Sequence, residues 1–124
     1  MVKALSYFRR RPELTVEAFQ DYWRSKHPEV VTRLPGIRGY VQSHTLPSGY
    51  RKARPLYDGI AEVWFEDTAA MRALAGTPSI KAVEADEAKL DVKELLRYGL
   101  QNAVAQEFTF PTPIEATESV KPVA

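Results

Sequence analysis

Alternating polar and apolar residues at the start of the chain predict a β-strand over residues 2–9. A helical pattern follows, because apolar or aromatic residues recur every three or four positions over residues 16–34. Thr15 suits the N-cap of this helix, and a Pro-Gly pair at residues 35–36 ends it. The first third of the chain therefore predicts a strand followed by an amphipathic helix.

The rest of the chain consists of short apolar segments separated by turn residues, which predict further strands and helices. One predicted strand carries polar and aromatic side chains at alternate positions, so that one of its faces holds Arg38, Tyr40, Gln42, His44 and Leu46. In chain order, the predicted elements are a strand at 37–46, an exposed loop at 47–56, a strand at 58–66, helices at 67–75 and 77–90, and a strand at 101–110.

This order of elements, βαββαβ, is typical of a ferredoxin-like α+β fold. We expect one domain over residues 1–110, with a four-stranded antiparallel sheet and helices on one face. Residues 111–124, rich in threonine, proline and glutamate, are expected to form an extended C-terminal tail. When the uncovered face of such a sheet carries large apolar side chains, a second copy usually covers it. The pattern therefore predicts a homodimer.

Composition restricts the partners and cofactors of this domain. Its 17 basic and 16 acidic side chains give a net charge of +1, which favours neither nucleic acid nor a membrane surface as a partner. The chain has no cysteine, and it shows neither the ligand spacing of a metal site nor a glycine-rich nucleotide loop. We therefore expect no cofactor. No signal peptide or bilayer-length apolar segment is visible, which favours a cytoplasmic protein.

His27 is the main candidate for chemistry, because it occupies the apolar stripe of the first helix. Steps of three or four positions from Trp23 to Val30 pass through residue 27. Histidine takes and gives protons near neutral pH, so a histidine on a buried face is a candidate general acid or base. The alternative is a core histidine bonded to a backbone carbonyl. Pro28 supports the first interpretation, because it predicts that the helix kinks or restarts there.

Residues of the 37–46 strand are candidates to complete an acid–base site. If the face that carries Tyr40 points toward the first helix, then Tyr40, Gln42 and His44 converge on His27. If that face points to solvent or to a dimer interface, His44 is an ordinary surface or interface residue. Tyr40 is equally well explained as a packing aromatic. The sequence leaves both arrangements open.

Other residues are candidates for the walls of a substrate pocket. Aromatic rings suit a planar substrate, although such residues more often belong to the core. Glu62 lies within an apolar strand, so it faces solvent, pairs with a cation such as Arg38, or lies in a pocket. The candidate substrate-binding residues are Tyr7, Phe19, Trp23, Arg38, Gln42, Glu62 and Trp64.

Several segments resemble the EthD family of dimeric α/β-barrel proteins. They are residues 19–28, 34–40 and 57–65, followed by Thr77-Pro78 and Asp86-Glu87. The resemblance spans most of residues 3–110. It implies a ferredoxin-like fold whose sheets face each other across a dimer, and a small-molecule pocket between the sheet and the helices.

The functions of this family are mixed. Its members include proteins linked to ether degradation, fungal polyketide dehydratases and decarboxylases, and a methylmuconolactone isomerase that needs no cofactor. In isomerase-like members, a helix histidine and a second histidine further along the chain are implicated in proton transfer. The resemblance implies this role for His27 by its motif, and it suggests His44 as the second histidine.

We therefore expect a cofactor-independent lyase or isomerase of a small cyclic, aromatic or polyketide-like metabolite, with His27, His44 and Tyr40 as catalytic candidates. Dehydration, decarboxylation and lactone isomerisation pass through a similar enolate, so the sequence does not choose among them. The alternative is a non-catalytic protein that binds a hydrophobic ligand or assists an oxygenase in ether degradation. Monooxygenase chemistry without a cofactor is a third interpretation, based on fold analogy alone.

Overall fold

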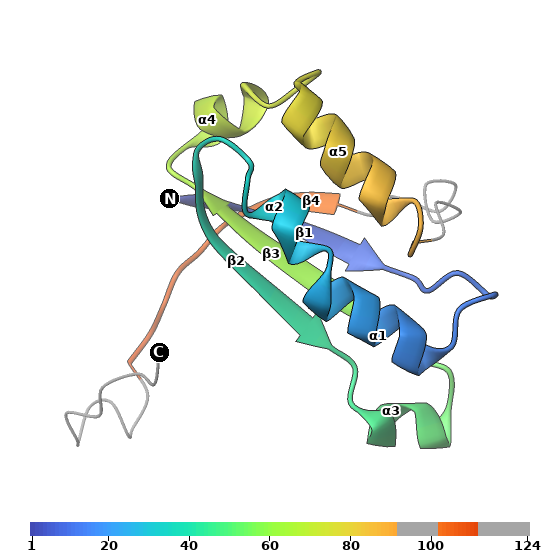
Figure 1. The fold of residues 1–124 in the computed structure, drawn as a ribbon. Coiled ribbons are helices and arrows are strands. Elements are labelled where there is room, and N and C mark those ends of the chain that lie inside the picture. The colour runs from blue at the N-terminus through green and yellow to red at the C-terminus, as the bar shows by residue number, and fades with distance from the viewer. Residues whose placement is uncertain (92–101, 112–124) are drawn as a thin grey trace.

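The elements follow the predicted order, with additional short helices in the connections. The computed structural model describes residues 1–91 and 102–111 (Figure 1). These residues form β1 (Val2–Phe8), α1 (Val16–Ser25), α2 (Pro28–Val31), β2 (Ile37–His44), α3 (Pro47–Lys52), β3 (Gly59–Phe65), α4 (Thr68–Arg72), α5 (Pro78–Glu87) and β4 (Asn102–Gln106).

The four strands form one antiparallel sheet in the order β2-β3-β1-β4, which confirms the ferredoxin-like α+β fold. Val63 of β3 lies opposite Tyr40 of β2 and Ala4 of β1, so these three side chains share one face of the sheet. The helices α1, α2 and α5 lie over this same face (Figure 1). The core and the pocket described below therefore lie between the sheet and one layer of helices.

The helix boundaries agree with the predicted caps. The Thr15 hydroxyl accepts a hydrogen bond from a backbone N–H in the first turn of α1. Thr77 caps α5 in the same way, and Pro78 occupies its first turn. Pro28 separates α1 from α2, so the helix restarts at His27, as the proline predicts.

Two connections differ from the prediction. Residues 47–56, expected to be an exposed loop, contain the helix α3, because Pro47 supplies the backbone angle of a first helical turn. The strand expected at 101–110 pairs only within β4. Most of the predicted tail, residues 112–124, lies outside the described residues.

The alternation along β2 differs from the prediction, because this strand contains a β-bulge. The pairing shifts between Ile37 and Gly39, so two residues of β2 lie opposite one residue of β3. Arg38 therefore does not continue the face that carries Tyr40. Its guanidinium is half exposed and binds the Glu66 carboxylate, with 3.1 Å between Nη1 and Oε2.

Two apolar clusters fill the space between the sheet and the helices. Gly59 of β3 allows the ring of Trp23 to lie against the strand, because a Cβ at this position would come within 2.4 Å of the ring. The first cluster consists of Phe8, Phe19, Trp23, Ala61 and Leu90. The second consists of Val31, Leu34, Phe65, Leu74 and Val83.

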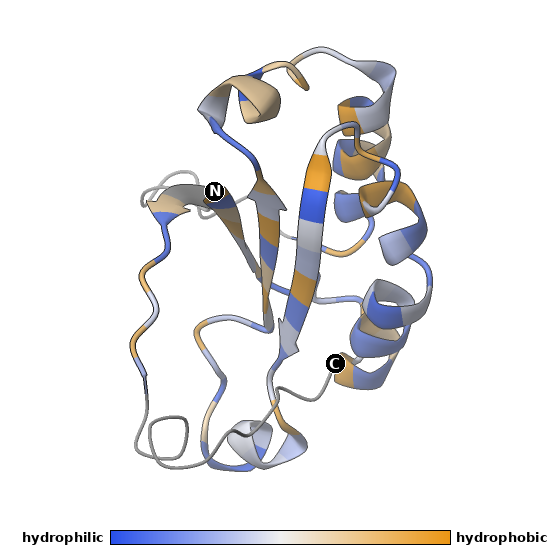
Figure 2. Cartoon of the chain, turned by 90° about the vertical axis from the view of Figure 1, so that its left-hand side faces the viewer, coloured by the Kyte–Doolittle hydropathy of each residue, from blue (hydrophilic) through white to orange (hydrophobic). Residues whose placement is uncertain are grey.

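No described helix covers the other face of the sheet. Figure 2 shows apolar and polar residues alternating along the strands. On the uncovered face, Lys3 of β1 forms an ion pair with Glu62 of β3, with 3.2 Å between Nζ and Oε1, and its Nζ lies over the Trp64 ring. Among the described residues, no helix is long and apolar enough to cross a membrane.

Candidate active site

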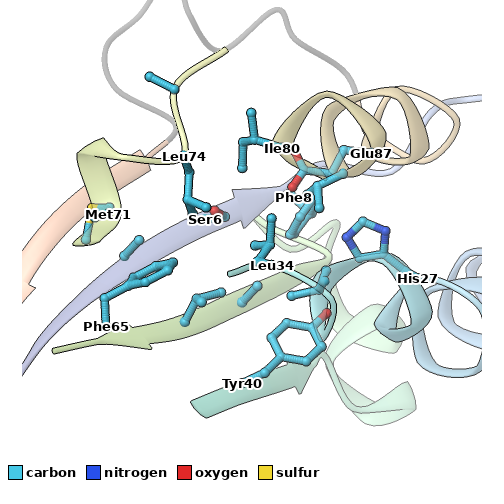
Figure 3. A pocket seen from close by; sticks show the side chains of 16 residues that line it. Ser6, Phe8, His27, Leu34, Tyr40, Phe65, Met71, Leu74, Ile80 and Glu87 are labelled. Carbon is cyan, nitrogen blue, oxygen red and sulfur yellow. The ribbon is translucent and has the colours of Figure 1, made fainter. Parts of the chain in front are cut away.

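A cavity of about 270 Å³ lies between the helix-covered face of the sheet and the helices (Figure 3). Twelve of its sixteen lining residues are apolar, so the cavity suits the hydrophobic body of a small molecule. The lining residues are Ala4, Ser6, Phe8, His27, Val31, Leu34, Tyr40, Ala61, Val63, Phe65, Met71, Leu74, Ala75, Ile80, Val83 and Glu87.

His27 supplies the imidazole of this cavity from the junction between α1 and α2. Its side chain is among the most deeply buried of the protein, with 1% of the residue exposed. The Nδ1 atom lies 2.6 Å from Oδ2 of Asp86, which comes from α5. Because the two nitrogens of an imidazole point away from each other, Nε2 points away from Asp86.

Asp86 is held as a carboxylate by a set of hydrogen-bond donors. Burial raises its pKa, but the hydrogen bonds from Tyr22 and His27 and the charge of Lys89 outweigh that effect, so the pKa lies below its ordinary value. The Tyr22 hydroxyl donates to Oδ1 over 2.7 Å. An anionic Asp86 fixes the proton of His27 on Nδ1 and stabilises the imidazolium that forms when Nε2 takes a proton.

Tyr40 reaches the cavity from β2, on the face that also carries Gln42 and His44. Figure 3 shows its ring extending from the strand toward the end of the cavity where His27 and Glu87 lie. Burial raises the pKa of Tyr40 to about 12, and the negative charge of Glu87 contributes to this rise. The hydroxyl therefore keeps its proton at neutral pH and acts as a hydrogen-bond donor.

The other candidates on the helix-covered side lie behind the cavity wall. Gln42 donates a hydrogen bond to the Tyr40 hydroxyl and does not line the cavity. His44 packs on the Trp23 ring, with 4.5 Å between ring centroids. Trp23 and Phe19 are fully buried in the first core cluster. Two of the three catalytic candidates, His27 and Tyr40, therefore line one cavity, and His44 lies outside it.

The remaining candidates lie away from the cavity. The uncovered face of the sheet carries Tyr7, Glu62 and Trp64. Along β1 and β3 these residues alternate with the ones that line the cavity, so their side chains point the other way. Tyr7 packs on Tyr57, and Glu62 pairs with Lys3 instead of Arg38. The structure does not bring these side chains together with His27.

Sequence reasoning did not assign a role to Asp86 or Glu87. The signal for Asp86 lies in the spacing of α5. Ile80 and Val83 mark the inward-facing side of this helix, and Asp86 falls on the same stripe three positions after Val83. A carboxylate on one buried stripe and a histidine on another predict a buried pair. Among the described residues, no group of three His, Asp or Glu side chains could hold a metal ion.

The fold and the cavity define a ferredoxin-like protein with a largely apolar cavity between its sheet and its helices. The chain belongs to the EthD family, since the EthD domain profile matches residues 11–91. The match includes His27, Tyr40 and Asp86. No curated protein sequence matches the chain significantly.

Solved structures support the same fold. An EthD family protein from Bacillus halodurans is 19% identical, with a TM-score of 0.65 over 87% of this chain and 99% of the other. SnoaB from Streptomyces nogalater, a cofactor-independent oxygenase, is 13% identical, with a TM-score of 0.60 over 90% and 97%. A dimeric ferredoxin-like protein from Bacteroides fragilis is 17% identical, with a TM-score of 0.57 over 86% and 95%. At these identities the likeness concerns the fold alone.

Proposed function

We propose that the protein is a cofactor-independent acid–base enzyme that moves a proton at a carbon next to a carbonyl group of a small hydrophobic metabolite. The observation that carries this proposal is that His27, whose Nδ1 is bound to Asp86, lines an apolar cavity. A buried imidazole oriented by a carboxylate is suited to take a proton from a bound molecule and to return it. A cyclic, aromatic or polyketide-like metabolite matches the apolar lining.

In this mechanism Nε2 of His27 removes the proton and Asp86 stabilises the resulting imidazolium. The negative charge that develops on the carbonyl oxygen is stabilised by a hydrogen-bond donor, for which Tyr40 is the nearest candidate. Return of the proton to another carbon gives an isomer. In a dehydration, a β-hydroxyl group of the enolate takes the proton from the imidazolium and leaves as water. In a decarboxylation, loss of carbon dioxide from a β-keto acid forms the enolate first, and a protonated His27 then donates its proton to the carbon. General acid–base catalysis of this kind contributes about 10²- to 10⁴-fold to a rate.

The test is hydrogen exchange from heavy water into a panel of muconolactones and aromatic polyketide analogues, compared between the parent and His27→Asn. We expect exchange at the acidic carbon in the parent and its loss in the variant, with unchanged circular dichroism. Equal exchange rates in the two proteins would overturn the role of His27. Arg33→Gln, at an exposed position outside the cavity lining, is the matched control and should exchange as the parent does.

A second candidate function is binding of a hydrophobic ligand without turnover, as an accessory protein of an oxygenase system. The predominance of apolar side chains in the cavity favours it. This function predicts saturable binding that His27→Asn leaves nearly unchanged. Binding without exchange for every compound of the panel would favour it over the enzyme.

We also propose that the protein acts as a homodimer through the uncovered face of its sheet. That face carries Val41 (44% exposed) together with Trp64 and Tyr7, and the structural neighbour from Bacteroides fragilis is dimeric. Sedimentation equilibrium should give twice the chain mass. Trp64→Glu, which places a second carboxylate beside Glu62 on this face, should shift the protein toward the monomer, whereas Arg33→Gln should not.

A further inference from the structure

Behind the cavity wall, one side chain links the Tyr40 hydroxyl to the backbone of α1. Gln42 Nε2 lies 2.7 Å from the carbonyl oxygen of Trp23 and 2.6 Å from the Tyr40 hydroxyl oxygen. A carbonyl oxygen accepts hydrogen bonds and never donates them, so the amide nitrogen of Gln42 must face Trp23. The opposite orientation would place two acceptor oxygens 2.7 Å apart. The hydrogen bond to the Trp23 carbonyl therefore fixes the orientation of the Gln42 amide.

The orientation of Gln42 in turn decides the role of the Tyr40 hydroxyl. One hydrogen of the amide goes to the Trp23 carbonyl and the other to the Tyr40 oxygen, so Tyr40 accepts this bond. Its own proton must then be donated to a different acceptor. Among the hydrogen bonds of residues 1–91 and 102–111, the Tyr40 hydroxyl takes part in the one from Gln42, as its acceptor. Because the Tyr40 ring lines the cavity, the proton is available to an acceptor atom of a ligand.

His44 supports the same orientation from the other side of the amide. Its Nε2 lies 2.8 Å from Gln42 Oε1, which can only accept, so Nε2 carries the proton. The ring is held in place by packing on Trp23. All three groups around Gln42 therefore have defined donor and acceptor roles, and the polarity of the chain runs from His44 through Gln42 to Tyr40.

We propose that Gln42 is a positioning residue that fixes Tyr40 as a hydrogen-bond donor to the carbonyl oxygen of the ligand in this cavity. The catalytic part of this proposal rests on the proposed function. The Tyr40 hydroxyl holds the ligand carbonyl so that the neighbouring carbon faces His27, and it stabilises the carbonyl oxygen as negative charge develops there. The ligand class is then an aromatic or cyclic carbonyl compound. His44 acts through Gln42 and does not touch the ligand.

The experiment compares two probes of nearly equal shape in the intact chain. Acetophenone carries a carbonyl oxygen, and α-methylstyrene replaces that oxygen with a methylene group. We expect the parent to bind the ketone about tenfold more tightly, as one net hydrogen bond allows. The carbonyl stretching frequency of bound acetophenone should fall below its value in hexane. Tyr40→Phe should remove both the preference and the frequency shift.

Gln42→Glu is the decisive variant, because its carboxylate has the same shape but accepts the Tyr40 proton. We expect the ketone preference and the frequency shift to disappear although Tyr40 is present. Gln42→Met removes both N–H donors of the amide and should weaken the ketone preference and the frequency shift. It provides a second test if the glutamate variant does not fold. Gln20→Glu is the matched control, since the Gln20 amide donates to the Thr45 carbonyl over 2.9 Å and does not contact Tyr40.

Two results would overturn the proposal. A parent that binds both probes equally has no hydrogen-bond donor to the ketone carbonyl, and a parent that binds neither contradicts the proposed ligand class. A ketone preference that survives Gln42→Glu and Gln42→Met shows that Gln42 does not orient Tyr40. These outcomes are separate from those of the exchange experiment, because binding of acetophenone requires no proton transfer by His27.

Discussion

His27 and Asp86 stand 59 positions apart in the sequence, yet their side chains meet over 2.6 Å between Nδ1 and Oδ2. The contact joins the restart of the first helical segment to the last turn of α5, the last described helix. It places an imidazole and a carboxylate side by side with little access to water. A buried imidazole that lines a cavity and is held by a carboxylate is typical of sites that move protons.

Replacement of Asp86 by asparagine should impair proton transfer more than it impairs folding. An amide donates as well as accepts, so it permits the tautomer that has the proton on Nε2 and cannot act as a base. We expect the exchange rate of the best panel compound to fall by about 10²- to 10⁴-fold. Unchanged exchange in Asp86→Asn would show that the carboxylate does not assist His27.

Acid should destabilise the protein partly through Asp86. Its pKa is lower in the folded protein, so the carboxylate contributes stability above its unfolded pKa of about 3.9, and this contribution is lost as the pH falls through the folded pKa. We expect the difference in unfolding free energy between the parent and Asp86→Asn to be largest at neutral pH and to shrink below pH ~4. Urea denaturation across this range measures it, and a constant difference would contradict the assignment.

Gly59 should not tolerate a side chain. A Cβ at this position would come within 2.4 Å of Cζ3 of Trp23, whose ring is fully buried. We expect Gly59→Ala to lower the unfolding free energy by about 1–3 kcal/mol, as overpacking of a core does. Gly49→Ala in α3 is the control, because its nearest neighbour is the Thr45 methyl at 3.1 Å and the position is exposed. Equal effects of the two substitutions would contradict this account of the core.

His44 should titrate below the usual range of histidine. Burial lowers its pKa, and the positive charge of Arg24 adds to the effect. The chain has two histidines, so proton NMR of the ring Cε1–H signals resolves the titration once His27→Asn assigns the second signal. Because burial is the larger cause, the depression should persist at high salt. A pKa at or above about 6.5 would contradict the packing of this ring.

The strands and the helix caps were predictable because they depend on local patterns. Alternation defined the strands, and Thr15 and Thr77 marked two helix starts through their side-chain oxygens. The restart at His27 followed from the chemistry of proline. These features need no knowledge of which residues meet in space.

The face on which each strand residue lies was harder to predict. A period of two separates Tyr40 and Gln42 from Val41 but does not say which set meets the helices. The pattern therefore suggests Glu62 and Trp64 as pocket residues, whereas the structure places them on the opposite face of the sheet. Asp86 received no role because its partner is distant in sequence, although its place on the buried side of α5 was visible.

The most direct test of the central claim is chemical rescue of a His27→Ala variant by imidazole. The substitution leaves a space beside Asp86 into which free imidazole fits. With a panel compound that the parent exchanges, we predict that His27→Ala loses exchange from heavy water and that added imidazole restores it in a saturable manner. Exchange that persists in His27→Ala without imidazole would contradict the claim that His27 is the base.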